Sequence, residues 1–188
     1  MYAPEDGGMG FYALSKSVSY APRRLTVLLD DATKDIADNN YKHCFVVNKL
    51  DHYIYTVMVR GQLVRIKPNT RTCELLLKKV GTSTRPDACD SYCAFSPVKG
   101  QENMLYVAMA EGNQIWRVDV GNLEGKDKNT YPGEGYAGKA ILEGQVAGAG
   151  WEDGLLRNAK FDNPHQICFT EDLSLIHISE PTRLDVIS

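Results

Sequence analysis

The residues best suited to redox or metal chemistry are the cysteines, of which the sequence has five. Cys89 and Cys93 are separated by three residues in a polar segment, and in an exported protein they are candidates for a local disulfide. No second cysteine or histidine pair has the spacing that a zinc site requires. Cys44, Cys73 and Cys168 each lie in an apolar run, where a small buried thiol is the ordinary role. We therefore predict no metal site and no cofactor.

The histidines and the short motifs of common enzymes do not define an active site. No P-loop, GxGxxG, GxSxG or HExxH motif is present. None of His43, His52, His165 and His177 lies four positions from another metal ligand. The sequence therefore predicts no catalytic residue from local spacing alone.

Composition and charge narrow the classes of partner. Hydrophobic residues make up 43% of the chain, charged residues 24%, and the formal net charge is -3. No basic field is present to bind nucleic acid, so a nucleic-acid partner is not expected. No stretch approaches the roughly 20 apolar residues of a membrane helix, and the first residues lack the features of a signal peptide. The protein is then either cytoplasmic or missing its true N-terminus, and the repeats below favour the second interpretation.

Short β-like runs separated by turn residues dominate the chain. Within residues 42–80 we expect four strands, at residues 43–48, 53–59, 62–67 and 73–78. Tight turns join them, with Arg60-Gly61 as the central hairpin. The pattern predicts an all-β fold and one four-stranded antiparallel meander.

The same pattern recurs about 50 residues later. Strands are expected at residues 92–97, 104–110, 114–119 and 139–143, with an exposed loop insertion at 121–138. The two central hairpins can be superimposed along the sequence, the alternative being chance similarity between β-rich segments. The matched pairs are Tyr55 with Tyr106, Met58 with Met109, Gly61 with Gly112 and Arg65 with Arg117. Repeats of this length are typical of β-propeller blades or solenoid units.

The repeat divides the chain into blades and fragments of blades. We expect residues 1–41 to hold the later strands of a truncated blade and a connector, and residues 42–80 and 81–147 to be two blades. Residues 148–172 should be a linker and the start of another blade. Residues 173–188 look like translated sequencing-adapter text and are expected to be non-native, the alternative being a genuine strand at 173–178. The prediction is thus a partial β-propeller of four-stranded antiparallel blades, which leaves unpaired edges that favour aggregation.

The most specific segment is the glycine-rich linker at residues 148–164. Its key positions are Gly150, Asp153, Gly154, Ala159, Phe161 and Pro164. Asp153-Gly154 suits a tight turn with glycine at positive φ, and Ala159 and Phe161 can point to one side of an extended chain. Pro164 fixes φ just before the next inner strand.

This linker resembles the inter-blade linker of NHL-repeat β-propellers, although that family usually has glycine where Gln166 stands here. The chain is also similar to bacterial surface proteins that place an IPT/TIG domain before an NHL-repeat propeller, and no such domain is visible. The resemblance implies a β-propeller exported to, or displayed on, the cell surface. It says little about a ligand, because fold does not fix function.

Four residues are candidates for ligand binding. Arg65 and Arg117 occupy matching positions and can belong to a ligand-facing ring, although solvent-facing arginines are common on strands. Trp151 lies in a loop beside glycines, where an exposed aromatic ring can stack on a sugar or a partner, and packing is its alternative. His165 begins an inner strand and faces either the central channel or a neighbouring loop.

The function predicted from these features is a non-enzymatic binding or scaffold module for a protein or glycan partner. The alternative is a propeller enzyme of the lyase or lactonase type, in which His165 and a residue of another blade hold a divalent ion in the channel. A structural spacer without a ligand is the third hypothesis.

Overall fold

The computed structural model describes residues 2–4, 11–14, 22–28, 42–58, 60–81, 91–138, 148–169 and 175–178. Within these ranges the fold is all-β apart from one 3-10 turn, so the predicted fold class is confirmed. Two four-stranded antiparallel sheets form its centre, with a smaller sheet at each end of the chain. None of the described helical residues forms a segment long and apolar enough to cross a membrane.

The first blade has the predicted meander. Its strands follow the order of the sequence and are β4 (Lys42–Val47), β5 (Ile54–Met58), β6 (Leu63–Lys67) and β7 (Thr72–Leu77). Three tight turns join the strands, and each contains a residue at positive φ: His52, Gly61 and Arg71. The central strand β5 is buried along its whole length, as expected for a strand packed on both faces.

The second blade repeats this order with one correction. Its strands are β8 (Ser91–Phe95), β9 (Met104–Met109), β10 (Gln114–Asp119) and β11 (Glu134–Ala137). The prediction of a fourth strand at residues 139–143 was wrong in position. The strand that pairs with β10 is β11, inside the stretch assigned to the loop insertion, while residues 139–147 lie outside the described ones.

The central hairpin of the second blade is one residue longer than that of the first, since Gly61 matches Gly112 but Arg65 matches Arg117. Ala110–Gly112 form the 3-10 turn, and Asn113 closes it in the left-handed conformation with φ of 53°. In the first blade, the corresponding hairpin turns at Gly61, whose N–H donates to the carbonyl of Met58 at 2.7 Å. The insertion is therefore absorbed within the turn, and the strands on either side keep their equivalence.

The end sheets confirm part of what was expected. An N-terminal sheet contains β1 (Tyr2–Pro4), β2 (Phe11–Leu14) and β3 (Pro22–Leu25), within the residues expected to hold strands of a truncated blade. At the other end, β12 (Gln166–Phe169) pairs with β13 (Leu175–Ile178). The structure thus has a strand in the tail, β13, as the alternative interpretation expected. The origin of residues 173–188 as adapter text stays a prediction.

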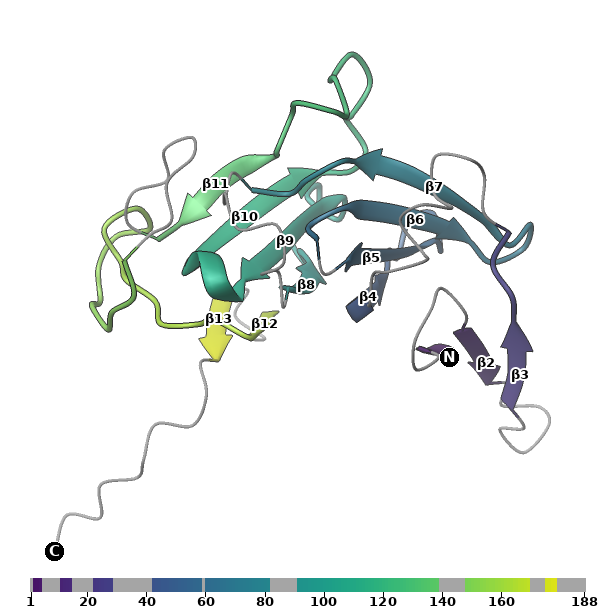
Figure 1. Ribbon diagram of the computed structural model, residues 1–188, viewed down its shortest axis with the longest axis horizontal. Coiled ribbons are helices and arrows are strands. Elements are labelled where there is room, and N and C mark those ends of the chain that lie inside the picture. Colours follow the sequence, from purple (N-terminus) through teal and green to yellow (C-terminus); the bar gives the residue numbers. More distant parts are fainter. Residues whose placement is uncertain are drawn as a thin grey trace, which may run out of the picture.

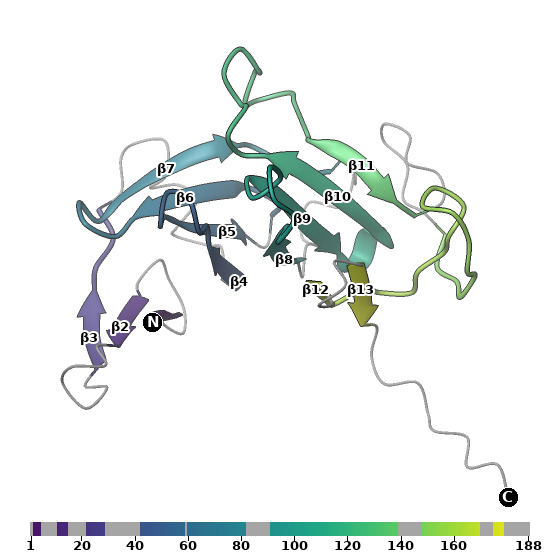
Figure 2. The same cartoon turned by 180° about the vertical axis from the view of Figure 1, so that it is seen from behind.

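The sheets lie side by side in an arc, with the N-terminal sheet at one end and β12 and β13 at the other (Figures 1 and 2). The first strand of each blade lies innermost, so that β4 contacts β8 and β8 contacts β12. Among the described residues, two apolar clusters lie between blades, and a third is formed by β5, β6 and β7 of the first blade with Val27 packed against it. Residues of the first and second blades share one cluster, and the second blade shares another with Ile167 of β12. This is a partial propeller arrangement.

Sheet register shows that the two blades are true repeats. Leu63 in β6 pairs with Leu77 in β7, and Ile115 in β10 pairs with Ala137 in β11. The register of both sheets shifts immediately after the first residue of these pairs, between Leu63 and Val64 and between Ile115 and Trp116. Because a bulge at one fixed position is a specific backbone feature, its recurrence is hard to attribute to chance.

Candidate functional site

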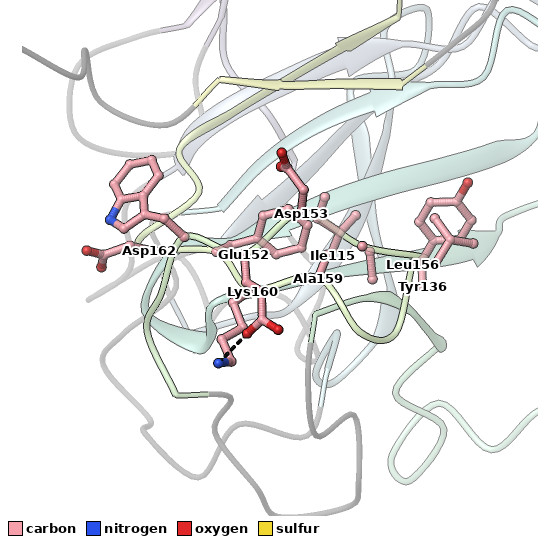
Figure 3. Close-up of a pocket in the computed structure, with 12 residues that line it drawn as sticks. Ile115, Tyr136, Glu152, Asp153, Leu156, Ala159, Lys160 and Asp162 are labelled. Carbon is pink, nitrogen blue, oxygen red and sulfur yellow. Dashed lines mark ion pairs between the residues drawn. The ribbon is translucent and has the colours of Figure 1, made fainter.

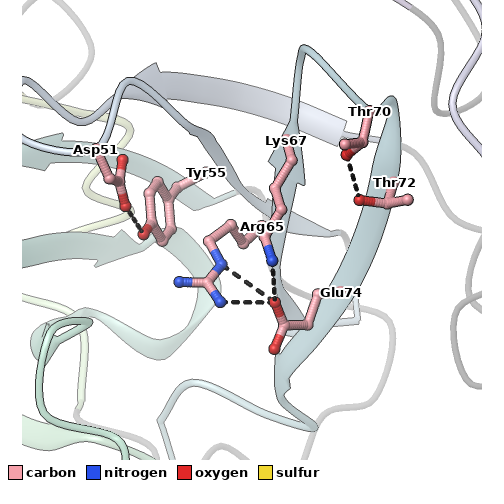
Figure 4. Close-up of polar contacts among 7 residues, drawn as sticks. All are labelled: Asp51, Tyr55, Arg65, Lys67, Thr70, Thr72 and Glu74. Carbon is pink, nitrogen blue, oxygen red and sulfur yellow. Dashed lines mark hydrogen bonds and ion pairs between the residues drawn. The ribbon is translucent and has the colours of Figure 1, made fainter.

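The two matched arginines form equivalent ion pairs within their own blades. Arg65 Nη2 lies 2.6 Å from Glu74 Oε2, and Lys67 Nζ lies 3.8 Å from the same oxygen (Figure 4). Arg117 Nε lies 3.0 Å from Glu134 Oε2. Each guanidinium also stacks over a tyrosine ring, Tyr53 for Arg65 at 5.5 Å and Tyr136 for Arg117 at 5.4 Å. In both cases the arginine pairs with the residue opposite it on the outer strand.

These pairings account for the electrostatics of the arginines. Partial burial lowers the pKa of Arg65, but the hydrogen bonds that it donates to Glu74 and Tyr55, together with their charges, outweigh burial and the net pKa is raised. The same balance, with Glu134 as the partner, raises the pKa of Arg117. Arg65 and Arg117 therefore remain charged within their own sheets, and neither lines the pocket described below.

His165 contacts the end of the linker and the first strand of the second blade. Its Nε2 lies 3.1 Å from Nδ2 of Asn163, and its ring meets the edge of Tyr92 with centroids 6.1 Å apart. The backbone N–H of Asn163 donates to Oδ1 of Asn113 at 2.9 Å, which ties the strand entry to the hairpin of the second blade. Among the described residues, no group of three or more His, Cys, Asp or Glu side chains is placed to hold a metal ion.

The linker folds back on itself beside the second blade. Lys160 N–H donates to the carbonyl of Glu152 at 2.9 Å, and the side chains of the same two residues form an ion pair. Gly138 N–H donates to the carbonyl of Leu156 at 2.9 Å, which fastens the loop to the end of β11. The linker is thus a hairpin-like loop held at its base and at its tip.

The structure shows how two residues of the linker motif pack, and it corrects the predicted turn. Phe161 packs into the cluster between the second blade and β12, and Pro164 is buried. The turn was expected at Asp153-Gly154 with glycine at positive φ, but Gly154 is not among the positive-φ residues and the turn lies at residues 155–158. An added Cβ at Gly154 would lie 3.4 Å from the backbone of Ala159, which is close to ordinary van der Waals contact.

Between this loop and the outer strands of the second blade lies a pocket of about 600 Å³. Its lining combines apolar groups with carboxylates, and Figure 3 shows Tyr136 and Leu156 toward one end and Asp162 toward the other. Glu152 and Lys160 neutralise each other at its margin. Trp151 also lines the pocket and is 61% exposed, so of the four predicted binding residues it alone belongs to this site.

The floor of the pocket has an equivalent in the first blade. Ile115 and Ala137 line the pocket, and their equivalents Leu63 and Leu77 are fully covered by the second blade. Trp116 and Val118, on the third strand of the second blade, belong to the same buried cluster as Leu63 and Leu77. In the described part of the chain, the sheet beyond the pocket contains β12 and β13 only. Neither β12 nor β13 contributes a described residue to the lining of the pocket, which the linker and β11 supply together with Ile115.

Four residues that line the pocket are not predicted as binding residues from the sequence: Ile115, Tyr136, Asp153 and Asp162. Tyr136 was assigned to a loop, although the run Glu134-Gly135-Tyr136-Ala137 after Pro132-Gly133 carries a weak strand signal. Ile115 could be placed on a strand but not in a pocket, since the linker that lies beside it is distant in the sequence.

Solved structures share this fold at low sequence identity. A structural genomics protein of unknown function from Bacteroides thetaiotaomicron matches with a TM-score of 0.62 and 17% identity, over 94% of this chain and 38% of the other. An auxiliary nutrient binding protein from Bacteroides ovatus matches with a TM-score of 0.58 and 16% identity, over 90% of this chain and 35% of the other. A protein of the same description from Bacteroides thetaiotaomicron gives 0.53 and 18%, over 91% and 40%.

These matches show the fold, and the chain spans about two fifths of the length of the structures it resembles. No protein-family model matches the sequence. No curated protein matches it either.

Proposed function

We propose that the chain is a non-enzymatic binding module of an NHL-type β-propeller, and that its ligand is a glycan held in the pocket beside Trp151. The observation that carries this proposal is an aromatic side chain, 61% exposed, that lines a pocket of about 600 Å³ together with Asp153 and Asp162. Ligand pockets of this size combine an apolar wall with a few polar groups that fix orientation.

The chemistry of the lining suits a saccharide. An indole ring offers a large flat apolar face, which packs against the C–H face of a pyranose ring. Carboxylates accept hydrogen bonds from sugar hydroxyls, and Asp153 and Asp162 both line the pocket. An anionic ligand is disfavoured, because Lys160, the cationic side chain among the described lining residues, is already paired with Glu152.

Two of the similar structures support the binding role. They are named auxiliary nutrient binding proteins, and a nutrient-binding function agrees with a pocket that has no metal cluster in the described residues. The NHL-type assignment rests on the linker motif, in which Phe161 and Pro164 pack as an inter-blade linker requires.

A protein partner is the second candidate, favoured by the apolar surface next to Trp151. Leu155 is 83% exposed and Leu156 is 50% exposed, and both lie in the same loop. Exposed apolar side chains that are adjacent on the surface mark protein contacts. Leu155 does not line the pocket, so a substitution there distinguishes a protein partner, which would contact Leu155, from a glycan held in the pocket.

The test is binding of the purified chain to a printed array of plant, host and microbial oligosaccharides. We expect a saccharide ligand whose affinity falls at least about tenfold, or roughly 1.4 kcal/mol, in Trp151→Ala. The matched control is Leu155→Ala, which removes an exposed apolar side chain from the same loop and should retain the affinity. Saccharide binding that survives Trp151→Ala would place the site elsewhere. Absence of any glycan ligand would overturn the glycan proposal in favour of the protein partner.

A further inference from the structure

Two cysteines from neighbouring blades meet where the innermost strands contact each other. Cys44 in β4 and Cys93 in β8 have their sulfur atoms 3.7 Å apart, although 49 positions separate them in the sequence. The backbone N–H of Cys93 donates to Sγ of Cys44 at 3.4 Å, and Sγ of Cys44 also lies 3.5 Å from the carbonyl oxygen of Cys93. Both thiols are free in the structure.

We propose that Cys44 and Cys93 form a reversible disulfide that links the first blade to the second. A disulfide needs an S–S distance of about 2.05 Å, so the sulfurs must approach by less than 2 Å, which rotation about the Cα–Cβ bonds can supply. The strands β4 and β8 belong to different sheets, so that side-chain packing rather than a strand ladder joins them. The bond would add a covalent link at the inner edge of this interface.

The two thiols differ in ways that assign their roles. Cys93 is 3% exposed, whereas Cys44 is only partly buried and more accessible. The pKa of Cys44 is lowered to about 7, mainly because the Cys93 side chain donates a hydrogen bond to its sulfur. Burial of Cys44 acts in the opposite direction, and the hydrogen bond with the Cys93 backbone lowers the pKa further. The same contact with Cys44, together with burial, raises the pKa of Cys93. Cys44 is thus the attacking thiol and Cys93 the resolving thiol.

The reaction requires a low-molecular-weight disulfide as oxidant. The Cys44 thiolate attacks one sulfur of this disulfide, forms a mixed disulfide and releases one thiolate. Cys93 then loses its proton and attacks the Cys44 sulfur, which completes the Cys44–Cys93 bond and releases the second thiolate. Two protein thiols are oxidised, and one external disulfide is reduced to two thiols.

This pairing competes with the local disulfide expected between Cys89 and Cys93. Cys89 lies outside the described residues, whereas Cys93 points to Cys44. A digest can tell the two apart, because cleavage before aspartate and after lysine releases Cys93 in residues 90–99, without Cys89, and Cys44 in residues 43–49.

The experiment treats the folded chain with oxidised glutathione, alkylates the remaining thiols and analyses the non-reduced digest by mass spectrometry. We expect residues 43–49 linked to residues 90–99, with the mass of two hydrogen atoms lost. The unfolding midpoint should rise by roughly 10 °C, because the bond closes a loop of about 50 residues.

Control variants make the result decisive. Cys44→Ser and Cys93→Ser should abolish both the linked peptide and the rise in the midpoint. Cys89→Ser and Cys168→Ser should retain both, since Cys168 is exposed on β12 and neither residue belongs to the proposed pair. The proposal is overturned if Cys93 links to Cys89, or if both peptides stay alkylated under conditions that oxidise an exposed thiol.

Discussion

Leu63 in β6 and Ile115 in β10 occupy the same position in consecutive blades, each immediately before the residue at which its sheet shifts register. Leu63 is covered by the second blade, whereas Ile115 lines the pocket beside the linker. The repeat thus places one apolar site in two environments. Among the described residues, Leu63 shares a cluster with Trp116 and Val118 of β10, whereas Leu156 and Phe161 of the linker line the pocket with Ile115.

The first prediction concerns Leu63 as a core residue of the blade interface. Leu63→Ala should lower the free energy of unfolding by about 3 kcal/mol, because it leaves a cavity between two packed blades. Leu50→Ala, at a turn position that is 57% exposed, is the matched control and should change it by less than about 0.5 kcal/mol. Urea denaturation measures both, and equal effects would contradict the packed interface.

The second prediction concerns Gly81, on which Trp116 packs. Gly81 has φ of +80°, and an added Cβ would lie 3.1 Å from Nε1 of Trp116. Gly100 has φ of +85°, with nothing within 4 Å of an added Cβ. Gly100→Ala should therefore cost about 1 kcal/mol of backbone strain, and Gly81→Ala roughly 2 kcal/mol or more. Thermal or urea unfolding checks the difference, and a smaller cost at Gly81 would rule out this close packing.

The third prediction concerns the equivalent ion pairs. A double-mutant cycle on Arg65 and Glu74 should give a coupling energy of about 0.5 kcal/mol, since the Glu74 side chain is half exposed and screened by solvent. The cycle on Arg117 and Glu134 should give a smaller value, because both side chains are more exposed there. Both couplings should shrink in high salt. A coupling that persists in high salt would show that these pairs act through packing instead.

The fourth prediction follows from the hydroxyl of Tyr55, which donates to Oδ2 of Asp51 at 2.6 Å (Figure 4). Burial, followed by this hydrogen bond, raises the pKa of Tyr55 above its usual value of 10.0. As the pH rises, the Tyr55 hydroxyl therefore ionises in the unfolded state before it does in the folded state. Its contribution to the free energy of unfolding is complete below pH 10 and is lost as the pH rises above 10.

Urea denaturation between pH 8 and pH 11 tests this linkage. The free energy of unfolding should fall more steeply with pH above 10 in the wild type than in Tyr55→Phe, by up to about 1.4 kcal/mol per pH unit. Tyr131 and Tyr136, whose pKa values are also raised by burial, remain in both proteins and leave a residual slope. Identical slopes in the two proteins would contradict the buried, hydrogen-bonded hydroxyl.

The strands of both central hairpins could be predicted from the sequence because local signals determine them. Apolar runs such as residues 104–109 alternate with turns that contain Gly61 or Gly112, and the structure has strands at these places. The fourth strand of the second blade could not be placed this way, because β11 contains Gly135 and is fixed by its pairing with β10. The more apolar run at residues 139–143 was the stronger local signal.

The site shows the same limit. Trp151 could be selected from its type and its glycine-rich surroundings, but Ile115 and Tyr136 join it only through the packing of the linker on the second blade. Likewise, Cys93 was paired with Cys89 because the two are close in sequence, whereas the closest described thiol belongs to Cys44 of the neighbouring blade. Contacts between blades depend on the tertiary arrangement, which spacing along the chain does not encode.

The most direct test of the account is an NMR titration of the two indole N–H groups with the saccharide selected on the array. Trp116 is buried, and its Nε1 donates to Oε1 of Gln114 at 3.1 Å, whereas Trp151 is exposed at the pocket. If the glycan binds beside Trp151, the Trp151 resonance should shift and saturate with the ligand while the Trp116 resonance stays in place. Saturable binding that leaves the Trp151 resonance unshifted would contradict it.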